Sequence, residues 1–352
     1  MKFILYISLF FLFISCENKT EYPVKLIKMK PLASYPAIQL KSEQISLSDA
    51  PLNPTKISVQ DTLLTIFEKQ VDNSETFLKF YSLKSGKLIH SYGQVGRGPG
   101  EYLTPTVHWE SPEKILITEK MKYTVFSLDS LFHNPSYMPL KKNVRVGLSA
   151  VNAVYRLNDS IFLENSTMAD YQFSLFNTKS NQYLINYKNY PNLIQDGRMT
   201  DFIANSNIYH ASLSLKRDNK DSIVIAYELF PMIDIVSLDN FGSTRVLFPF
   251  DKQVNIVTVM DNLNAMVKNR KSYYTQSYCT DKYIYLMYDC KKPQSKEYAS
   301  PEIHLFDWNG NFIKRYQADQ YISNFCVDEK SNIIYGIGAD TDYNPILLKF
   351  SK

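Results

Sequence analysis

A run of glycines around one arginine and one glutamate is the densest set of residues suited to chemistry in this sequence. The chain contains 11 glycines, and four of them lie in Gly93-Gln94-Val95-Gly96-Arg97-Gly98-Pro99-Gly100-Glu101-Tyr102. Glycine reaches positive φ without steric cost, so this density indicates a backbone held on an unusual path. Such a path could cradle a phosphate, support catalysis or brace a turn.

The pattern argues against nucleotide binding. A P-loop needs Lys and then Ser or Thr after its glycines, with a helix behind them. Here Pro99 interrupts the run, no Lys-Ser pair follows, and the flanking residues are typical of strands. A dinucleotide fingerprint fails for the same reason. Two interpretations remain: Arg97 pairs with Glu101 or with carbonyl groups and braces the turn, or its planar guanidinium binds an anionic ligand.

The elements that position this loop are repeated pairs of short apolar strands. Six units begin near residues 61, 113, 159, 221, 281 and 331, each with a turn residue, an apolar strand, a variable loop and a second strand. The spacing of roughly 45 to 60 residues fits four-stranded propeller blades. Strands rich in Tyr, Phe, Ile, Val and Thr agree with this interpretation. We therefore expect an all-β, six-bladed β-propeller with about four antiparallel strands in each blade.

The ends of the chain are expected to close the ring. The sixth unit runs out after Ile346–Phe350, so it lacks an outermost strand. The segment from Ala37 to Leu47 could supply that strand, which would remove an exposed sheet edge. Helical periodicity is nearly absent, and residues 261–271 are the one segment expected to form a short helix.

The first residues indicate export. Lys2 precedes an apolar run from Phe3 to Ile14, which is too short to span a bilayer but suits a signal peptide. The following Ser15-Cys16 resembles a bacterial lipobox, in which the cysteine is acylated and becomes the new N-terminus; an ordinary signal peptide is the alternative. We expect a signal peptide over 1–15, a lipidated Cys16 with a tether over 16–34, and the propeller over 35–352.

Charge and cysteine content exclude several classes. The net charge is +4, and the Lys and Arg residues are scattered, so no nucleic-acid partner is expected. The three remaining cysteines, Cys279, Cys290 and Cys326, are too few for a disulfide scaffold and lack metal-site spacing. Buried free thiols are expected, although a bridge between Cys279 and Cys326 is conceivable from their similar places in successive repeats.

With the lipobox, the six repeats and the sequence Gly96-Arg97-Gly98-Pro99-Gly100-Glu101, the chain resembles the six-bladed, TolB-like β-propeller lipoproteins of Bacteroidetes. The resemblance covers roughly residues 35–352, and the glycine-rich motif is its most specific element. The resemblance implies a fold and a cell-envelope location, and the function of that family is largely uncharacterised. We expect a monomeric outer-membrane lipoprotein, facing the periplasm or the cell surface.

Two functional hypotheses follow. The first is a non-catalytic module that binds a protein, peptide or glycan, since binding residues concentrate on loops over a rigid scaffold. Its ligand-binding candidates are Arg97, Glu101, Tyr102, His108 and Trp109. The second is a calcium-dependent lactonase or esterase in the central channel, because six-bladed propellers include such enzymes. The oxygen donors that it would draw on are Glu110, Asn152, Asn158, Asn205, Asn207, Asn324 and Asp328. No catalytic residue and no other cofactor is assigned.

Four Asp-Ser/Thr-apolar triplets resemble the O-glycosylation sequon of exported Bacteroidetes proteins. Their acceptor residues would be Thr62, Ser130, Ser160 and Ser222. Turn chemistry at the starts of strands explains the same residues equally well, because Asp and Ser side chains bond to nearby backbone groups.

Overall fold

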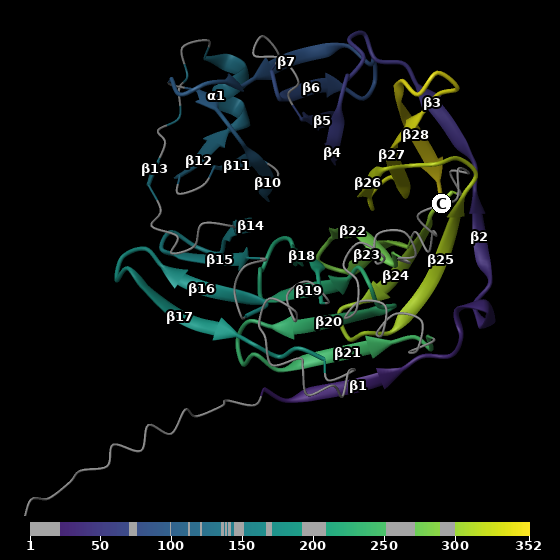
Figure 1. The fold of residues 1–352 in the computed structure, drawn as a ribbon. Helices are drawn as coiled ribbons and strands as arrows, with labels where there is room; N and C mark the ends of the chain where they lie inside the picture. Colours follow the sequence, from purple (N-terminus) through teal and green to yellow (C-terminus); the bar gives the residue numbers. More distant parts are fainter. Residues whose placement is uncertain are drawn as a thin grey trace, which may run out of the picture.

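The chain forms a ring of six β-sheets. The computed structural model describes residues 22–69, 76–98, 100–111, 113–119, 122–134, 137, 139, 142–143, 151–166, 171–191, 209–250, 272–288 and 300–352. The sheets stand around a central axis like blades, each with its first strand innermost (Figure 1). The six-bladed β-propeller expected from the repeats is therefore confirmed.

Blades 1 to 3 are formed by consecutive segments of the chain. Blade 1 consists of β4 (Pro54–Gln60), β5 (Leu63–Glu68), β6 (Leu78–Ser82) and β7 (Leu88–Tyr92). Blade 2 consists of β10 (Thr106–Ser111), β11 (Lys114–Glu119), β12 (Lys122–Ser127) and β13 (Lys142–Asn143), with helix α1 (Leu128–His133) after β12. Blade 3 consists of β14 (Val151–Arg156), β15 (Ile161–Ser166), β16 (Phe173–Asn177) and β17 (Gln182–Tyr187).

Blades 4 to 6 complete the ring. Blade 4 consists of β18 (Ala211–Leu215), β19 (Ser222–Tyr227), β20 (Met232–Ser237) and β21 (Ser243–Leu247). Blade 5 consists of β22 (Tyr274–Cys279), β23 (Tyr283–Tyr288), β24 (Glu302–Asp307) and β25 (Phe312–Ala318). Blade 6 contains β26 (Asn324–Asp328), β27 (Ile333–Ala339) and β28 (Pro345–Ser351).

An N-terminal strap, residues 22–45, runs along the rim of these three blades (Figure 1). Strand β1 (Val24–Lys28) pairs in parallel with β21, and β2 (Ala37–Leu40) pairs in parallel with β25 after a short 3₁₀ turn at Leu32–Ser34. Strand β3 (Ser42–Ile45) pairs antiparallel with β28 and becomes the outermost strand of blade 6. The expected ring closure is thus confirmed, and β3 makes it.

The strap also corrects a boundary. Residues 24–28 were expected to belong to a tether, but they form the fifth strand of blade 4. This segment joins the blade because it carries apolar side chains: Ile27 and Met29 pack against the core cluster between blades 4 and 5. The parallel pairing of β1 and β2 to the rims of two blades was not anticipated.

Packing between blades explains the continuous apolar strands. Residues Ile223–Tyr227 of β19 are all buried, as are Leu64–Ile66 of β5. A middle strand with neighbouring blades on both faces needs apolar side chains at successive positions, without the alternation of a half-exposed strand.

The short helix predicted at 261–271 lies outside the described residues. Helix α1, which follows β12, was not predicted.

A buried polar network joins blades 3 and 4. Arg245 of β21 donates two hydrogen bonds of 2.7 Å each to the carboxylate of Asp234, which is fully buried on β20. The Tyr227 hydroxyl donates to the same carboxylate at 2.8 Å, and Gln172 of blade 3 donates to that hydroxyl at 2.6 Å. Arg245 also donates to the carbonyl of Asn189, which follows β17. One buried ion pair therefore connects two blades.

Candidate functional site

The glycine-rich loop connects the rim of blade 1 to the first strand of blade 2. Strand β8 (Gln94–Val95) pairs in parallel with β9 (Glu101–Tyr102), and the loop folds back between them. The Glu101 carboxylate accepts a hydrogen bond of 2.7 Å from the Gly98 amide. A Cβ at position 96 would lie 2.0 Å from the Glu101 Oε2 atom, so any larger residue there would displace this carboxylate. Glu101 therefore braces the turn.

The other loop candidates lie away from the channel wall. Arg97 is exposed, and its side chain has no hydrogen bond or ion pair to any residue in the described ranges. Tyr102 is buried at 2 % exposure, and its ring meets Phe77 edge-on at 5.3 Å between centroids. The expected bracing pair between Arg97 and Glu101 or a carbonyl group is therefore not formed with any described residue, and Glu101 braces the loop through the Gly98 amide instead. Ligand binding by Arg97, Glu101 or Tyr102 stays a prediction.

Replacing Gly93 by Ala is expected to destabilise the protein by about 1–3 kcal/mol, the range for a strained backbone position. Gly93 has φ +78°, and a Cβ there would lie 2.1 Å from the ring of fully buried Phe77. Gly100→Ala is the matched control, because Gly100 has φ +74° but its added Cβ would lie 3.8 Å from the nearest atom. Urea unfolding should show a larger loss for Gly93→Ala, and equal losses would contradict the predicted steric clash.

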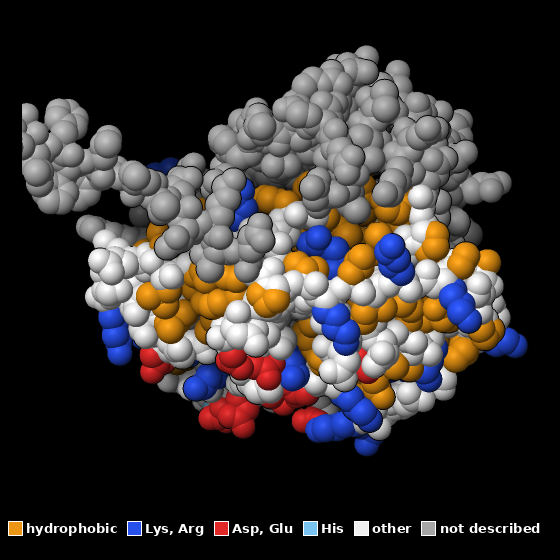
Figure 2. Space-filling model, turned by 90° about the horizontal axis from the view of Figure 1, so that it is seen from below, with side chains coloured by type: hydrophobic (Ala, Val, Ile, Leu, Met, Phe, Trp, Pro, Cys, Tyr) orange, Lys and Arg blue, Asp and Glu red, His pale blue; other side chains and the backbone are white. Residues whose placement is uncertain are grey.

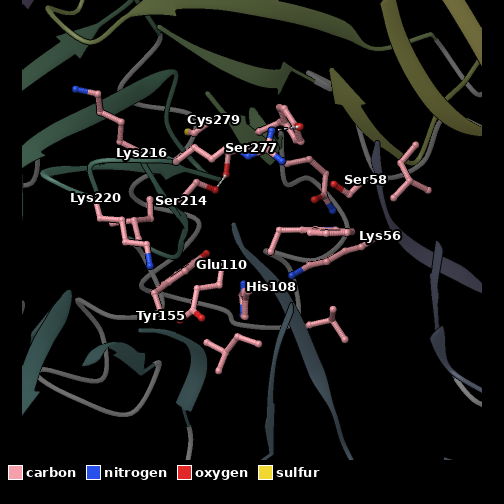
Figure 3. A pocket seen from close by; sticks show the side chains of 18 of the residues that line it. Lys56, Ser58, His108, Glu110, Tyr155, Ser214, Lys216, Lys220, Ser277 and Cys279 are labelled. Carbon is pink, nitrogen blue, oxygen red and sulfur yellow. Dashed lines mark hydrogen bonds between the residues drawn. The ribbon is translucent and has the colours of Figure 1, made fainter. Parts of the chain in front are cut away.

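The central channel contains a cavity of about 190 Å³. Its wall takes side chains from the first strand of every blade, β4, β10, β14, β18, β22 and β26, and from the turn after β18. His108 and Trp109, two of the sequence candidates, belong to this wall with Glu110 and Asn324. Figure 3 shows Lys56, His108 and Lys220 entering the channel from different sides. The lining residues are Lys56, Ile57, Ser58, Val107, His108, Trp109, Glu110, Leu116, Tyr155, Arg156, Ser214, Leu215, Lys216, Arg217, Lys220, Gln276, Ser277, Tyr278, Cys279, Asn324 and Phe325.

Positive charge dominates the described wall. Its cations are Lys56, Arg156, Lys216, Arg217 and Lys220, and Glu110 is its one carboxylate. Glu110 is engaged, because the Arg156 guanidinium donates to both of its oxygens, at 2.5 and 3.1 Å. None of these cations was among the candidates predicted from the sequence.

Lys56 and His108 face each other across part of this channel. The Lys56 side chain is exposed to the channel solvent, but the surrounding walls desolvate its ammonium and lower its pKa to about 8. Burial, reinforced by the charge of Lys56, holds the pKa of His108 well below its usual value, so the imidazole is neutral. The His108 ring lies 4.6 Å from the Tyr155 ring, and its Nε2 atom is buried with no hydrogen-bond partner in the described part of the chain.

Replacing Lys56 by Met is expected to stabilise the protein at pH 7. A lysine whose pKa is lower in the folded than in the unfolded state opposes folding below the folded value, about 8. That cost disappears between pH 8 and the ordinary lysine pKa of about 10.4, because only the unfolded chain then binds the proton. Melting temperatures from pH 7 to 10 should show the advantage of the variant shrinking as pH rises. A constant difference would place the origin of the effect in packing.

Small hydroxyl groups occupy the opposite wall. The Ser214 Oγ atom of β18 and the Ser277 Oγ atom of β22 lie 2.7 Å apart, and Ser212 approaches Ser277 at 3.4 Å. The Tyr155 hydroxyl donates to the Leu213 carbonyl at 2.6 Å. The Asn324 side-chain oxygen accepts from the Ile57 amide at 3.3 Å, which joins blade 6 to blade 1. These contacts fix the first strands around the cavity.

The described oxygen donors do not fit a calcium ion. Asn158 and Asp328 cap turns: the Asn158 oxygen accepts from the Ser160 and Ile161 amides, and Asp328 accepts from Lys330 and Ser331. Within the described ranges, no three His, Cys, Asp or Glu side chains group as metal ligands. Asn205, Asn207 and the side chain of Asn152 lie outside the described residues.

A channel in which cations surround a carboxylate already bound to arginine is unfavourable for Ca²⁺. We therefore expect that neither calcium nor a chelator changes the melting temperature. Calcium would be added at about 1 mM, which is enough to occupy weak extracellular calcium sites. A rise with calcium that the chelator reverses would restore the hydrolase hypothesis.

The described cysteines are free thiols. Cys279 and Cys326 are free, so the conceivable bridge between them is absent, and burial raises the pKa of both thiols. Cys16 and Cys290 lie outside the described residues.

The four candidate glycosylation sites lie in different environments. Thr62 is exposed in a turn, whereas Ser130 lies within α1 and Ser160 and Ser222 are half-buried. Glycosylation at the four positions stays a prediction.

The comparisons with known proteins agree with this geometry. Residues 41–330 match the family model described as TolB-like 6-blade propeller-like. The chain belongs to this family. A comparison with curated proteins finds no match. Among solved structures, a protein of Bacteroides fragilis described as exported is 14% identical with TM-score 0.55, covering 93% of this chain and 99% of that one. A DUF4221-family member from Bacteroides vulgatus is 11% identical with TM-score 0.51, covering 90% of this chain and 97% of that one. At these identities the likeness concerns the fold.

Proposed function

We propose that this member of the family is a lipid-anchored binding module of the cell envelope, which receives part of a protein, peptide or glycan ligand in its central channel. The observation that carries the proposal is the cavity of about 190 Å³, whose polar and cationic wall draws on all six blades. This volume is below the range of about 300–1,000 Å³ that buries a whole drug-sized ligand. The channel therefore suits one terminal group of a larger molecule.

The start of the described chain supports the anchoring part of the proposal. The Tyr22 ring stacks on Tyr187 at 4.9 Å and lies 5.9 Å from Phe241, which fixes the strap beside blades 3 and 4. Six residues lead from Cys16 to Tyr22, and they span at most about 20 Å. A lipid on Cys16 would hold this part of the rim close to the membrane.

The rim beside β1 exposes hydrophobic side chains, which suits a surface held close to a membrane. Figure 2, which looks onto the side where β1 lies, shows hydrophobic side chains across the rim. Val24, Leu26 and Leu184 are 41%, 50% and 53% exposed there. No helix within the described ranges is long and apolar enough to cross a bilayer. Cys16→Ala should release the protein from the membrane fraction, and protease treatment of intact cells should distinguish a surface location from a periplasmic one.

The binding proposal is tested by filling the channel. Ser214→Trp would place an indole in the cavity, whereas Ser180→Trp adds the same group to an exposed turn between β16 and β17. Wild-type protein and both variants would be screened on glycan and peptide arrays after their melting temperatures confirm folding. We expect ligands that bind wild type and Ser180→Trp but not Ser214→Trp. Array binding that survives in Ser214→Trp would overturn the channel as the site.

A further inference from the structure

The channel carries more positive charge than its own carboxylates balance. Arg156 pairs with Glu110 and, at 2.9 Å, with Asp159, so its charge is compensated. Lys216 lies 3.2 Å from an oxygen of Asp221, and its ammonium stands 5.6 Å from the centre of the Trp308 ring. In Figure 3 the end of Lys216 points away from the channel centre. These two cations therefore belong to the scaffold.

None of the other three cations, Lys56, Arg217 and Lys220, forms a salt bridge with a carboxylate among the described residues, although the charge of Glu110 acts on Lys220. Lys220 donates to the Arg156 carbonyl at 2.8 Å, and Arg217 donates to the Tyr278 hydroxyl at 3.3 Å. Lys56 forms no hydrogen bond or salt bridge with any described residue, and its ammonium points into the cavity (Figure 3). The pKa values of Lys56 and Lys220 are both lowered, because the surrounding protein removes water from their charged ammonium groups.

His108 adds a donor beside Lys56. Its Nε2 atom is buried without a hydrogen-bond partner in the described part of the chain, although buried polar atoms are nearly always bonded. As a neutral imidazole with the proton on Nε2, it would donate one hydrogen bond to a group in the cavity. Lys56 can supply up to three donors on one charge. Together they form an unfilled site for an acceptor with negative charge.

We propose that the channel of this protein is an anion site, in which Lys56 and His108 bind one carboxylate, sulfate or phosphate group at the end of the ligand. This inference rests on the proposed function of the channel and names the chemistry of its ligand. Arg217 and Lys220, in the turn after β18, contribute positive potential that attracts the anion, since clefts lined by one sign of charge focus the field. An acidic sugar, a sulfated or phosphorylated glycan, or an acidic peptide end would carry such a group.

The experiment measures the binding of three probes, sodium sulfate, sodium phosphate and sodium acetate, by calorimetry at constant ionic strength. Wild type is expected to bind at least one of them saturably with a millimolar or tighter Kd. Lys56→Met should weaken that binding by about 10- to 100-fold, as expected for the loss of a charge-assisted hydrogen bond. Lys84→Met is the matched control, because it removes the same charge from an exposed turn in blade 1. Lys56→Arg should retain most of the affinity.

Two further arms separate the contributions. His108→Phe keeps a ring against Tyr155 and should weaken binding by about 5- to 10-fold through the loss of one neutral donor. Sulfate does not titrate near neutrality, so its affinity should fall from pH 7 to pH 9 as Lys56, with a pKa of about 8, loses its charge. The other charged or titratable groups of the wall are His108, Glu110, Tyr155, Arg156, Lys216, Arg217, Lys220, Tyr278 and Cys279.

The inference is overturned if no probe binds wild type saturably, or if Lys56→Met and Lys84→Met weaken binding equally. Its failure is distinguishable from failure of the proposed function. Array ligands that require an open channel but bind Lys56→Met as well as wild type would preserve the binding module and remove the anion site. Array ligands indifferent to Ser214→Trp would remove the channel function itself.

Discussion

Replacing Asp234 by Asn is expected to lower the free energy of unfolding by about 3–5 kcal/mol, the cost of removing one partner from a buried ion pair. Asp234 is fully buried and accepts from Arg245 and from Tyr227. Without the charge of Asp234, Arg245, a residue that is only 9% exposed, keeps a positive charge with no carboxylate partner among the described residues. The change also disturbs the Tyr227 and Gln172 link between blades 3 and 4.

Urea unfolding of the purified protein measures this effect. Asp239→Asn, on an exposed turn of the same blade, is the matched control and should change stability by no more than about 0.5 kcal/mol. The double variant Asp234→Asn/Arg245→Met should lose less than the sum of the two single variants, because it leaves no charge unpaired. A loss below about 1 kcal/mol for Asp234→Asn would contradict the structural role given to this pair.

Removing residues 1–46 is expected to abolish cooperative folding, whereas removing residues 1–41 should leave a folded, less stable protein. The longer deletion takes β3 away from β28 and opens the ring at blade 6. An open ring exposes the unpaired backbone groups of β28 and invites association through that edge. The shorter deletion removes β1 and β2, which only extend the rims of blades 4 and 5.

Size-exclusion chromatography and thermal unfolding compare the two truncated proteins. The protein lacking 1–41 should elute as a monomer with one cooperative transition at a lowered temperature, since it loses buried Leu40 and the contacts of Ile27. The protein lacking 1–46 should elute in aggregates or melt without a sharp transition. Equal melting temperatures for the two would show that β3 does not hold the ring closed.

The sequence is sufficient to predict the blades because each repeat contains its own signals. The run Ile223–Tyr227 is apolar at successive positions, which a strand between two other blades requires. The Asp residues at 61, 159, 221 and 281 mark the turns between the first and second strands. The strap was only partly predictable, because β1 and β2 join rims formed by residues more than 200 positions away, and local patterns do not specify such partners.

The site was less accessible to sequence reasoning. The glycine-rich loop stood out because glycine is rare elsewhere in the chain, but its carboxylate serves the loop itself. Two of the ligand-binding candidates, His108 and Trp109, line the channel because they lie on a first strand beside that loop. Lys56 gave no comparable signal: one lysine among 39 basic residues becomes distinctive only when six first strands converge on one axis. Polar residues at alternate positions of some first strands, such as Lys56 and Ser58 of β4 and Ser212 and Ser214 of β18, are the pattern that would have indicated it.

The most direct test of the channel as an anion-binding site is a crystal structure of the protein soaked with selenate, whose selenium scatters anomalously. We expect an anomalous peak inside the channel, with selenate oxygens within hydrogen-bond distance, about 2.7–3.2 Å, of the Lys56 Nζ and His108 Nε2 atoms. The same peak should be absent from Lys56→Met crystals of the same form. Selenate found only on lysines of the outer surface, with none in the channel, would contradict the account.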